Sequence, residues 1–113
     1  MTTPFLSIII PAQNEAELLP QTLSSVQSYL AEKDFDAEVI VVENASTDDT
    51  AQIVRDWQEK MPNLRLISRQ EPGKGGAVKQ GMLEARGTYR FMADADLSMP
   101  IMELDKFLAP DID

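Results

Sequence analysis

The segment FLSIIIPAQNE, residues 5–15, joins an apolar strand to the start of a polar loop. Its first part, Phe5–Ile10, is short and rich in β-branched residues, which is typical of a buried strand. Asn14 lies three residues before Glu17, and this capping-box spacing predicts that a helix begins at Asn14. Apolar residues then recur at helical spacing and form one face of that helix: Leu19, Leu23, Val26 and Leu30.

Strands and helices alternate along the rest of the chain. Three further short apolar runs predict strands at Ala37–Val42, Asn63–Ser68 and Thr88–Ala93. Helices are predicted from a capping signal at Ser46 and Asp49, over Gly75–Arg86 with Gly87 as its stop, and from Ser98 and Pro100 to Leu108. This order implies right-handed crossovers and a mostly parallel sheet with helices on both faces. We therefore expect one α/β, Rossmann-like domain over residues 1–113.

The composition narrows the chemistry that this chain supports. It has 113 residues, which is one domain at most, and it contains neither cysteine nor histidine. Within these residues that excludes disulfides, thiolate chemistry and imidazole catalysis. The formal net charge of −9 argues against a nucleic-acid partner. Met1–Pro4 lacks a signal-peptide pattern, and no apolar run approaches the ~20 residues of a membrane-spanning helix. We expect a cytoplasmic protein, with any membrane segment beyond residue 113.

In a doubly wound sheet, a ligand binds beyond the carboxyl ends of the strands. This rule selects residues 11–15, 43–48, 68–76 and 94–98. In the second segment, the carboxylate of Glu43 is able to accept hydrogen bonds from the N–H groups of a nucleobase. Helix capping explains Ser46 and Asp48 but leaves Glu43 without a role. In the third segment, glycines flank Lys74 at a helix start, which favours a phosphate cradle of backbone N–H groups.

The fourth segment contains two carboxylates one residue apart, Asp94 and Asp96. These side chains repel each other, and an oxygen-ligated divalent cation removes the repulsion. Magnesium and manganese prefer carboxylate, phosphate and water oxygens, so the same cation would hold a diphosphate. Residues 65–90 carry 6 basic and 2 acidic side chains and lie between two acidic segments. We interpret this pattern as an anion site beside a cation site; a solvated surface with a polar loop is the alternative.

Together, the four segments resemble the inverting GT-A glycosyltransferases of the large family that includes polyprenyl-phosphate sugar transferases. The resemblance covers residues 5–108. The family patterns I-P-x-x-N-E, V-V-D-D-G-S-x-D, G-K-G-x-A and D-x-D are similar to Ile10–Glu15, Val41–Asp48, Gly73–Ala77 and Asp94–Asp96. The strings GKGGAV and ADADLS look most like the dolichyl-phosphate glucosyltransferase branch. The fold implied is the N-terminal, nucleotide-binding half of a GT-A domain.

The resemblance implies a nucleoside pocket lined by Pro11, Gln13 and Glu15. Glu43 would occupy the position of the family's base-reading Asp. The chain departs from the family here, because Gln13 replaces a common Tyr and removes ring stacking. Glu43 and Asn44 also replace a pair of aspartates.

The resemblance also implies a phosphate and metal site. Lys74 would approach the phosphates, and Asp94 would face the nucleotide. Asp94 and Asp96 would hold the divalent cofactor, Mn²⁺ or Mg²⁺. Ala45 replaces a family glycine, so a positive φ at that position would cost free energy.

The implied reaction is transfer of a hexose to polyprenyl phosphate with inversion, with UDP-glucose favoured over GDP-mannose as donor. Competing hypotheses are another sugar acceptor, a nucleotide-binding module without transferase activity, a nucleotidyltransferase and a purely structural role. The resemblance further implies roughly a hundred or more additional residues that would carry the acceptor site. We therefore expect residues 1–113 alone to be the nucleotide-sugar-binding half, inactive in transfer and prone to self-association through an exposed sheet edge.

Overall fold

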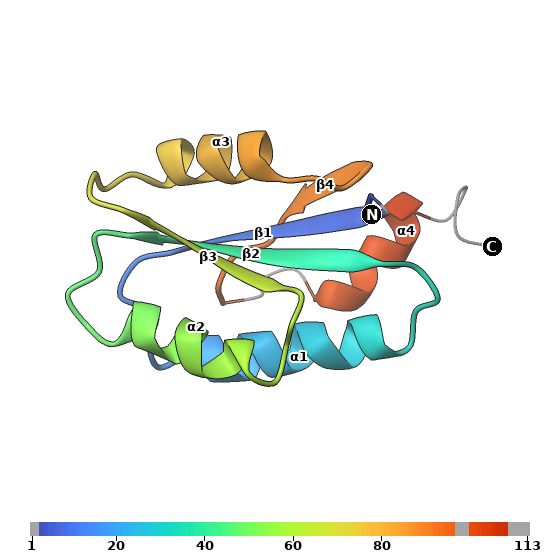
Figure 1. The fold of residues 1–113 in the computed structure, drawn as a ribbon, viewed down its shortest axis with the longest axis horizontal. Coiled ribbons are helices and arrows are strands. Elements are labelled where there is room, and N and C mark those ends of the chain that lie inside the picture. The colour runs from blue at the N-terminus through green and yellow to red at the C-terminus, as the bar shows by residue number, and fades with distance from the viewer. Residues whose placement is uncertain (1–2, 97–99, 109–113) are drawn as a thin grey trace.

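The structure is a computed structural model that describes residues 3–96 and 100–108. Its strands are β1 (Leu6–Ala12), β2 (Ala37–Asn44), β3 (Leu64–Arg69) and β4 (Tyr89–Met92) (Figure 1). Its helices are α1 (Leu19–Ala31), α2 (Thr50–Gln58), α3 (Lys74–Glu84), the 3-10 turn η1 (Ile101–Glu103) and α4 (Leu104–Leu108). The strands form one parallel sheet in the order β3-β2-β1-β4. This confirms the predicted fold class. None of the helices described is long and apolar enough to cross a membrane.

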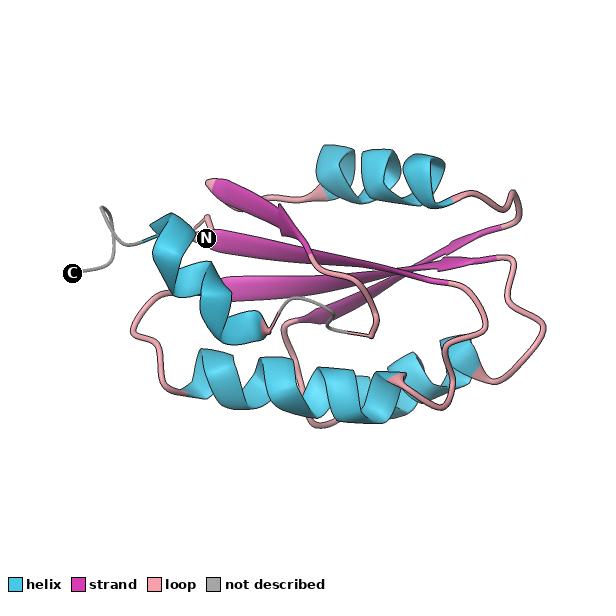
Figure 2. Cartoon of the chain, turned by 180° about the vertical axis from the view of Figure 1, so that it is seen from behind, coloured by secondary structure: helices cyan, strands magenta, loops and turns pink. Residues whose placement is uncertain are grey.

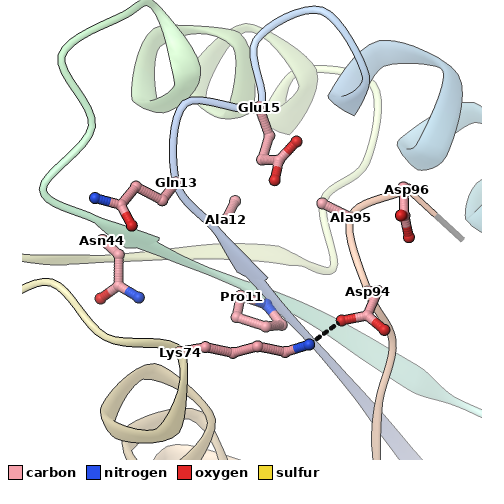
Figure 3. Close-up of a pocket in the computed structure, with 9 residues that line it drawn as sticks. All are labelled: Pro11, Ala12, Gln13, Glu15, Asn44, Lys74, Asp94, Ala95 and Asp96. Atoms are coloured by element: carbon pink, nitrogen blue, oxygen red, sulfur yellow. Dashed lines mark hydrogen bonds and ion pairs between the residues drawn. The ribbon is translucent and has the colours of Figure 1, made fainter.

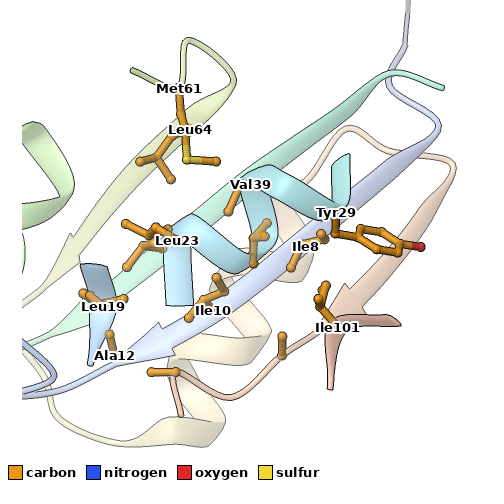
Figure 4. Close-up of a cluster of buried hydrophobic side chains, with 14 of the residues drawn as sticks. Ile8, Ile10, Ala12, Leu19, Leu23, Tyr29, Val39, Met61, Leu64 and Ile101 are labelled. Atoms are coloured by element: carbon orange, nitrogen blue, oxygen red, sulfur yellow. The ribbon is translucent and has the colours of Figure 1, made fainter. Parts of the chain in front are cut away.

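Helices cover both faces of the sheet, with α1 and α2 on one side and α3 on the other (Figures 1 and 2). The strands supply alternate residues to the two sides, because successive side chains of a strand point to opposite faces. The larger core, on the α1 side, includes Ile8, Ile10, Val39 and Val41 (Figure 4). The smaller core, under α3, includes Ile9, Ile40, Val42 and Ala77. This burial on both sides is why the central parts of the two strands, Ile8–Ile10 and Val39–Val42, are continuous apolar runs in the sequence.

Two glycines allow close packing on the α3 side. A Cβ atom added to Gly81 would lie 2.5 Å from Cγ2 of Ile9, so this residue lets α3 approach the sheet. A Cβ atom added to Gly87 would lie 2.5 Å from Oγ of Ser7. The prediction that Gly87 stops the helix is wrong, because the helix is already capped by Ala85 in an extended conformation. Gly87 is required instead where the chain passes β1.

Both predicted capping boxes are also wrong. α1 begins at Leu19 rather than Asn14, and Pro20 lies in its first turn, where a missing N–H has no cost. α2 begins at Thr50, and the side chain of its N-cap residue, Asp49, makes no capping hydrogen bond. The last predicted helix begins later, with η1 following Pro100, while Ser98 lies outside the described residues.

Two strands form the edges of the sheet. Among the residues that the structure describes, β4 pairs only with β1 and β3 only with β2. An edge strand presents unpaired N–H and C=O groups to solvent or to another strand. Self-association of the chain through such an edge stays a prediction.

A buried carboxylate accepts several hydrogen bonds near the amino-terminal ends of the strands. Glu38 is 6% exposed and accepts hydrogen bonds from the hydroxyl of Ser7 (2.6 Å), the N–H of Arg86 (2.6 Å) and Nη1 of Arg65 (2.9 Å). Oγ of Ser7 in turn accepts the N–H of Gly87 at 2.8 Å. Burial alone would raise the pKa of Glu38, but these hydrogen bonds and the charge of Arg65 lower it overall. The network therefore ties β1, β2 and β3 to the start of the β4 segment.

We predict that Glu38→Gln lowers the free energy of unfolding by about 2 kcal/mol at pH 7, because buried donors lose a charged acceptor. A carboxyl whose pKa is lowered by folding stabilises the fold above its unfolded value, near 4.5. The difference between wild type and variant should therefore shrink as the pH falls through and below this value. Urea denaturation at pH 7 and at lower pH measures both effects.

Glu84→Gln is the matched control, because Glu84 is 43% exposed and its carboxylate lies 3.9 Å from the same Arg65. It should change stability by less than about 0.5 kcal/mol. An equal loss for the two variants, or a Glu38→Gln loss that does not depend on pH, would contradict the prediction.

Candidate functional site

A cavity of about 410 Å³ lies where the carboxyl ends of β1, β2 and β4 meet the start of α3 (Figure 3). It is lined by Pro11, Ala12, Gln13, Glu15, Asn44, Lys74, Asp94, Ala95 and Asp96. The structure thus brings together six of the seven site residues predicted from the sequence. The seventh, Glu43, is not among the lining residues.

The loop after β1 is hydrogen-bonded to the loop after β2. The N–H of Asn14 donates to Oγ of Ser46 (3.0 Å), and Oδ1 of Asn14 accepts the N–H of Thr47 (2.8 Å). Asn14 has a positive φ of 54°, a conformation that asparagine tolerates better than most residues. Residues expected to cap two helices therefore join two loops at the rim of the cavity.

The backbone N–H groups of Glu15 and of the residue after it also form hydrogen bonds to side chains that follow β2 in the sequence. The N–H of Glu15 donates to Oγ1 of Thr50 (3.0 Å), and the N–H of Ala16 donates to Oδ2 of Asp48 (3.2 Å). Hydrogen bonds from the hydroxyl and the N–H of Thr50 lower the pKa of Asp48. With its backbone held, Glu15 directs its carboxylate into the cavity (Figure 3).

Acidic side chains converge on this cavity. Burial raises the pKa of Glu15, and the negative charges of Asp96 and Asp48 raise it further. Within the described residues, no three acidic side chains form a metal centre by themselves. Asp94 and Asp96 nevertheless fit Mg²⁺ or Mn²⁺, because such ions are commonly held by one or two carboxylates, with phosphate and water oxygens completing the shell. The donor set suits a cation shared with a diphosphate.

Lys74 connects the glycine-rich loop to the end of β4. Gly73 precedes it with a φ of 125°, a conformation that favours glycine. Lys74 is therefore the first residue of α3, and its ammonium pairs with Oδ1 of Asp94 (Figure 3). The hydrogen bond and the charge of Asp94 raise the pKa of Lys74. An exposed positive charge thus lies beside the carboxylates.

Glu43 and Asn44 differ in the side of the sheet that they face. The carboxylate of Glu43 is buried and accepts the N–H of Ser46 at 2.5 Å, so it shapes the turn after β2. Asn44 is 2% exposed, lines the cavity and donates through Nδ2 to the carbonyl of Gly73 (2.9 Å). Its Oδ1 is buried without a hydrogen-bond partner in the described part of the chain.

Sequence reasoning missed Asn44, although strand periodicity would have found it. Val42, two residues earlier, packs under α3, and residues two apart share a face. Asn44 therefore faces the helix that begins with Lys74, whereas Glu43 shares its face with Val41 in the other core. A buried acceptor without a partner among the described residues calls for a hydrogen bond from a water molecule or a ligand.

Comparison with known proteins identifies the family. The family model described as "Glycosyl transferase family 2" matches residues 7–111. The chain belongs to glycosyl transferase family 2. Its curated relatives include a dolichyl-phosphate β-glucosyltransferase of Dictyostelium discoideum, 44% identical over 100 residues, which are 81% of this chain and 31% of the relative. The chain spans about a third of the length of the curated relatives that it matches.

Solved structures agree with the family. The mannosyltransferase PcManGT from Pyrobaculum calidifontis, in complex with GDP-Man and Mn²⁺, has a TM-score of 0.74 and 33% identity and covers 91% of this chain and 30% of its own. TarS 1-349 of S. aureus, in complex with UDP, has a TM-score of 0.72 and 27% identity and covers 93% of this chain and 32% of its own. The predicted GT-A fold is confirmed by these neighbours.

Proposed function

We propose that this chain binds the donor of a metal-dependent glycosyltransferase that transfers a hexose from a nucleotide sugar to polyprenyl phosphate. The observation that carries the proposal is one cavity lined by Asn44, Lys74, Asp94 and Asp96. These residues offer a buried acceptor for a base, a positive charge for a phosphate and carboxylates for a cation. The base, the diphosphate and its counter-cation would make these three kinds of contact within one pocket.

Asn44 and its neighbours would bind the nucleoside. The free Oδ1 accepts one N–H, which the ring of either uracil or guanine supplies. We favour UDP-glucose because the similar curated proteins are dolichyl-phosphate β-glucosyltransferases. GDP-mannose is the alternative, supported by the likeness to a mannosyltransferase solved with GDP-Man. Pro11, Gln13 and Glu15 would line the same pocket.

The start of α3 and the end of β4 would hold the diphosphate. The N–H groups of the first turn of α3 suit an anion, and Lys74 adds a positive charge beside them. Lys74 would leave Asp94 for the diphosphate, and Asp94 and Asp96 would then hold Mn²⁺ or Mg²⁺. When bound, such a cation neutralises the charge that develops on a leaving diphosphate.

The acceptor phosphate would be its own nucleophile. A phosphate monoester has a second pKa near ~6 and is largely a dianion at pH 7, so its oxygen attacks without a general base. This oxygen would form a bond to the anomeric carbon while the bond from that carbon to the diphosphate oxygen breaks. Attack from the face opposite the leaving group inverts the configuration. A polyprenyl phosphate is held in a bilayer by its lipid tail. We therefore also propose that the protein acts at the cytoplasmic side of a membrane.

The base-reading role of Asn44 gives the first prediction. Asn44→Ala should weaken UDP binding about tenfold, since a ligand N–H in a buried site would lose its acceptor. Asn44→Asp, which keeps an acceptor, should weaken it less. Glu43→Gln should leave the affinity unchanged while lowering stability. Isothermal titration calorimetry with UDP measures these affinities. A loss of UDP affinity in Glu43→Gln but not in Asn44→Ala would show that Glu43 reads the base.

A second prediction separates the metal from the phosphate contacts. Asp96→Ala should abolish the increase in UDP affinity that Mn²⁺ produces. Lys74→Ala should weaken UDP binding less, because the backbone N–H groups of α3 remain. In the absence of nucleotide, Lys74→Ala should instead tighten Mn²⁺ binding, because Asp94 loses its ion pair. Calorimetry with Mn²⁺ and UDP, separately and together, tests this, with Lys79→Ala, an exposed lysine of the same helix, as the control.

A transfer assay tests the reaction itself. It uses the full-length protein with manganese, radiolabelled UDP-glucose or GDP-mannose, and either polyprenyl phosphate or a free sugar. We expect label in the lipid phase from UDP-glucose, and no transfer by residues 1–113 alone. Label from GDP-mannose only would reject the donor, and label in a sugar product only would reject the acceptor. Nucleotide binding without any transfer would favour a binding module.

A further inference from the structure

The loop that carries Asp94 and Asp96 is held by a buried hydroxyl from α1. Oγ1 of Thr22 donates to the carbonyl oxygen of Ala95, the residue between the two carboxylates. Thr22 is 4% exposed and Ala95 is 5% exposed, so water does not replace this bond. The two residues are 73 positions apart in the sequence, so the contact is a tertiary one.

Thr22 is a polar residue in the apolar face of its helix. Its neighbours on this face, Leu19, Leu23 and Val26, are fully buried in the main core. A threonine hydroxyl inside a helix commonly bonds to a carbonyl of its own preceding turn. Here the hydroxyl bonds instead to a loop on another element, which is a contact that the packing of α1 does not require.

The accepting carbonyl lies in the peptide plane that joins Ala95 to Asp96. Because a peptide unit is planar, holding its oxygen restricts the direction in which the chain continues to Asp96. Asp94 lies on the other side of Ala95 and points toward Lys74, whereas Asp96 lies on the side of Glu15 (Figure 3). A single bond to this carbonyl therefore influences the spacing of both carboxylates around the cavity.

A second tether joins the same helix to the segment that follows, away from the carboxylates. The hydroxyl of Tyr29 donates to Oδ1 of Asp105 (2.7 Å), and Nζ of Lys33 lies 2.9 Å from the same oxygen. Tyr29 is two turns along α1 from Thr22, about 10 Å away along the helix axis. This contact secures α4 without touching the loop of Asp94 and Asp96.

We propose that Thr22 is a positioning residue that sets the two carboxylates for a divalent cation and diphosphate. The inference rests on the proposed function of the cavity. Thr22 contacts neither ligand and acts through the backbone of Ala95. Removal of its hydroxyl lets this peptide rotate, so the carboxylates spend less time in the arrangement that a shared cation needs.

The test measures Mn²⁺ binding in the presence of UDP by electron paramagnetic resonance, on the full-length protein. Thr22→Val, which keeps the volume and removes the hydroxyl, should weaken binding roughly tenfold, the usual effect of losing a group that orients metal ligands. Thr22→Ser should restore wild-type affinity. Tyr29→Phe is the matched control: it removes one buried hydroxyl of the same helix and should lower the melting temperature without altering Mn²⁺ affinity.

Three results would overturn the proposal: wild-type affinity in Thr22→Val, equal losses in Thr22→Val and Tyr29→Phe, or no restoration by Thr22→Ser. Thr22→Ala is the second variant if the valine methyl prevents folding; if neither folds, the hydroxyl serves the fold in general and the proposal fails. A wild-type protein that binds Mn²⁺ with neither UDP nor GDP would instead reject the proposed function.

Discussion

The parallel pairing of β1 on both of its sides is the constraint on which the rest of the structure depends. β1 is in register with β2 over seven residue pairs and with β4 over four, and every one of its residues is buried. Parallel strands leave the sheet at the same edge, so the loops after β1, β2 and β4 must meet there. Gln13, Asn44 and Asp94 reach one cavity for this reason. The direction of the strands thus determines where the cavity lies, and the side chains at the strand ends determine its chemistry.

Negative charge is stabilised at the amino-terminal ends of the strands and disfavoured at their carboxyl-terminal ends. At the amino-terminal edge, Glu38 receives hydrogen bonds from Ser7, Arg65 and a backbone N–H, so its charge is satisfied by the fold. At the carboxyl-terminal ends of the strands, burial raises the pKa of Glu15, and the negative charges of Asp96 and Asp48 raise it further. A carboxyl group whose pKa the fold raises in a cavity is a candidate for a ligand site rather than for a stabilising network.

The sequence predicted the strands well and the helix starts poorly, and the reason is physical. Strands buried on both faces leave a continuous apolar run, which is a local signal. The residue types that cap helices are the same types that form hydrogen bonds to distant loops. Asn14 does the latter, since it bonds to Ser46 and Thr47. Thr22 left no signal, because its acceptor is a backbone carbonyl far along the chain. The predicted cavity lining was nearly complete because strand ends can be located, while Glu43 was chosen over Asn44 because side-chain facing was not considered.

Charge balance suggests that neither a cation nor a nucleotide would bind well to this cavity alone. A diphosphate alone meets the carboxylates of Asp94 and Asp96, which repel it. A cation alone must displace Lys74 from Asp94, which breaks the ion pair between them. Bound together, the two ligands resolve both conflicts, because the diphosphate takes Lys74 while the cation takes the carboxylates. Opposite charges of similar size then enter the cavity at once, and each ligand raises the affinity for the other by the same factor. Under the proposed function, the ion pair between Lys74 and Asp94 is therefore the ligand-free form of the site.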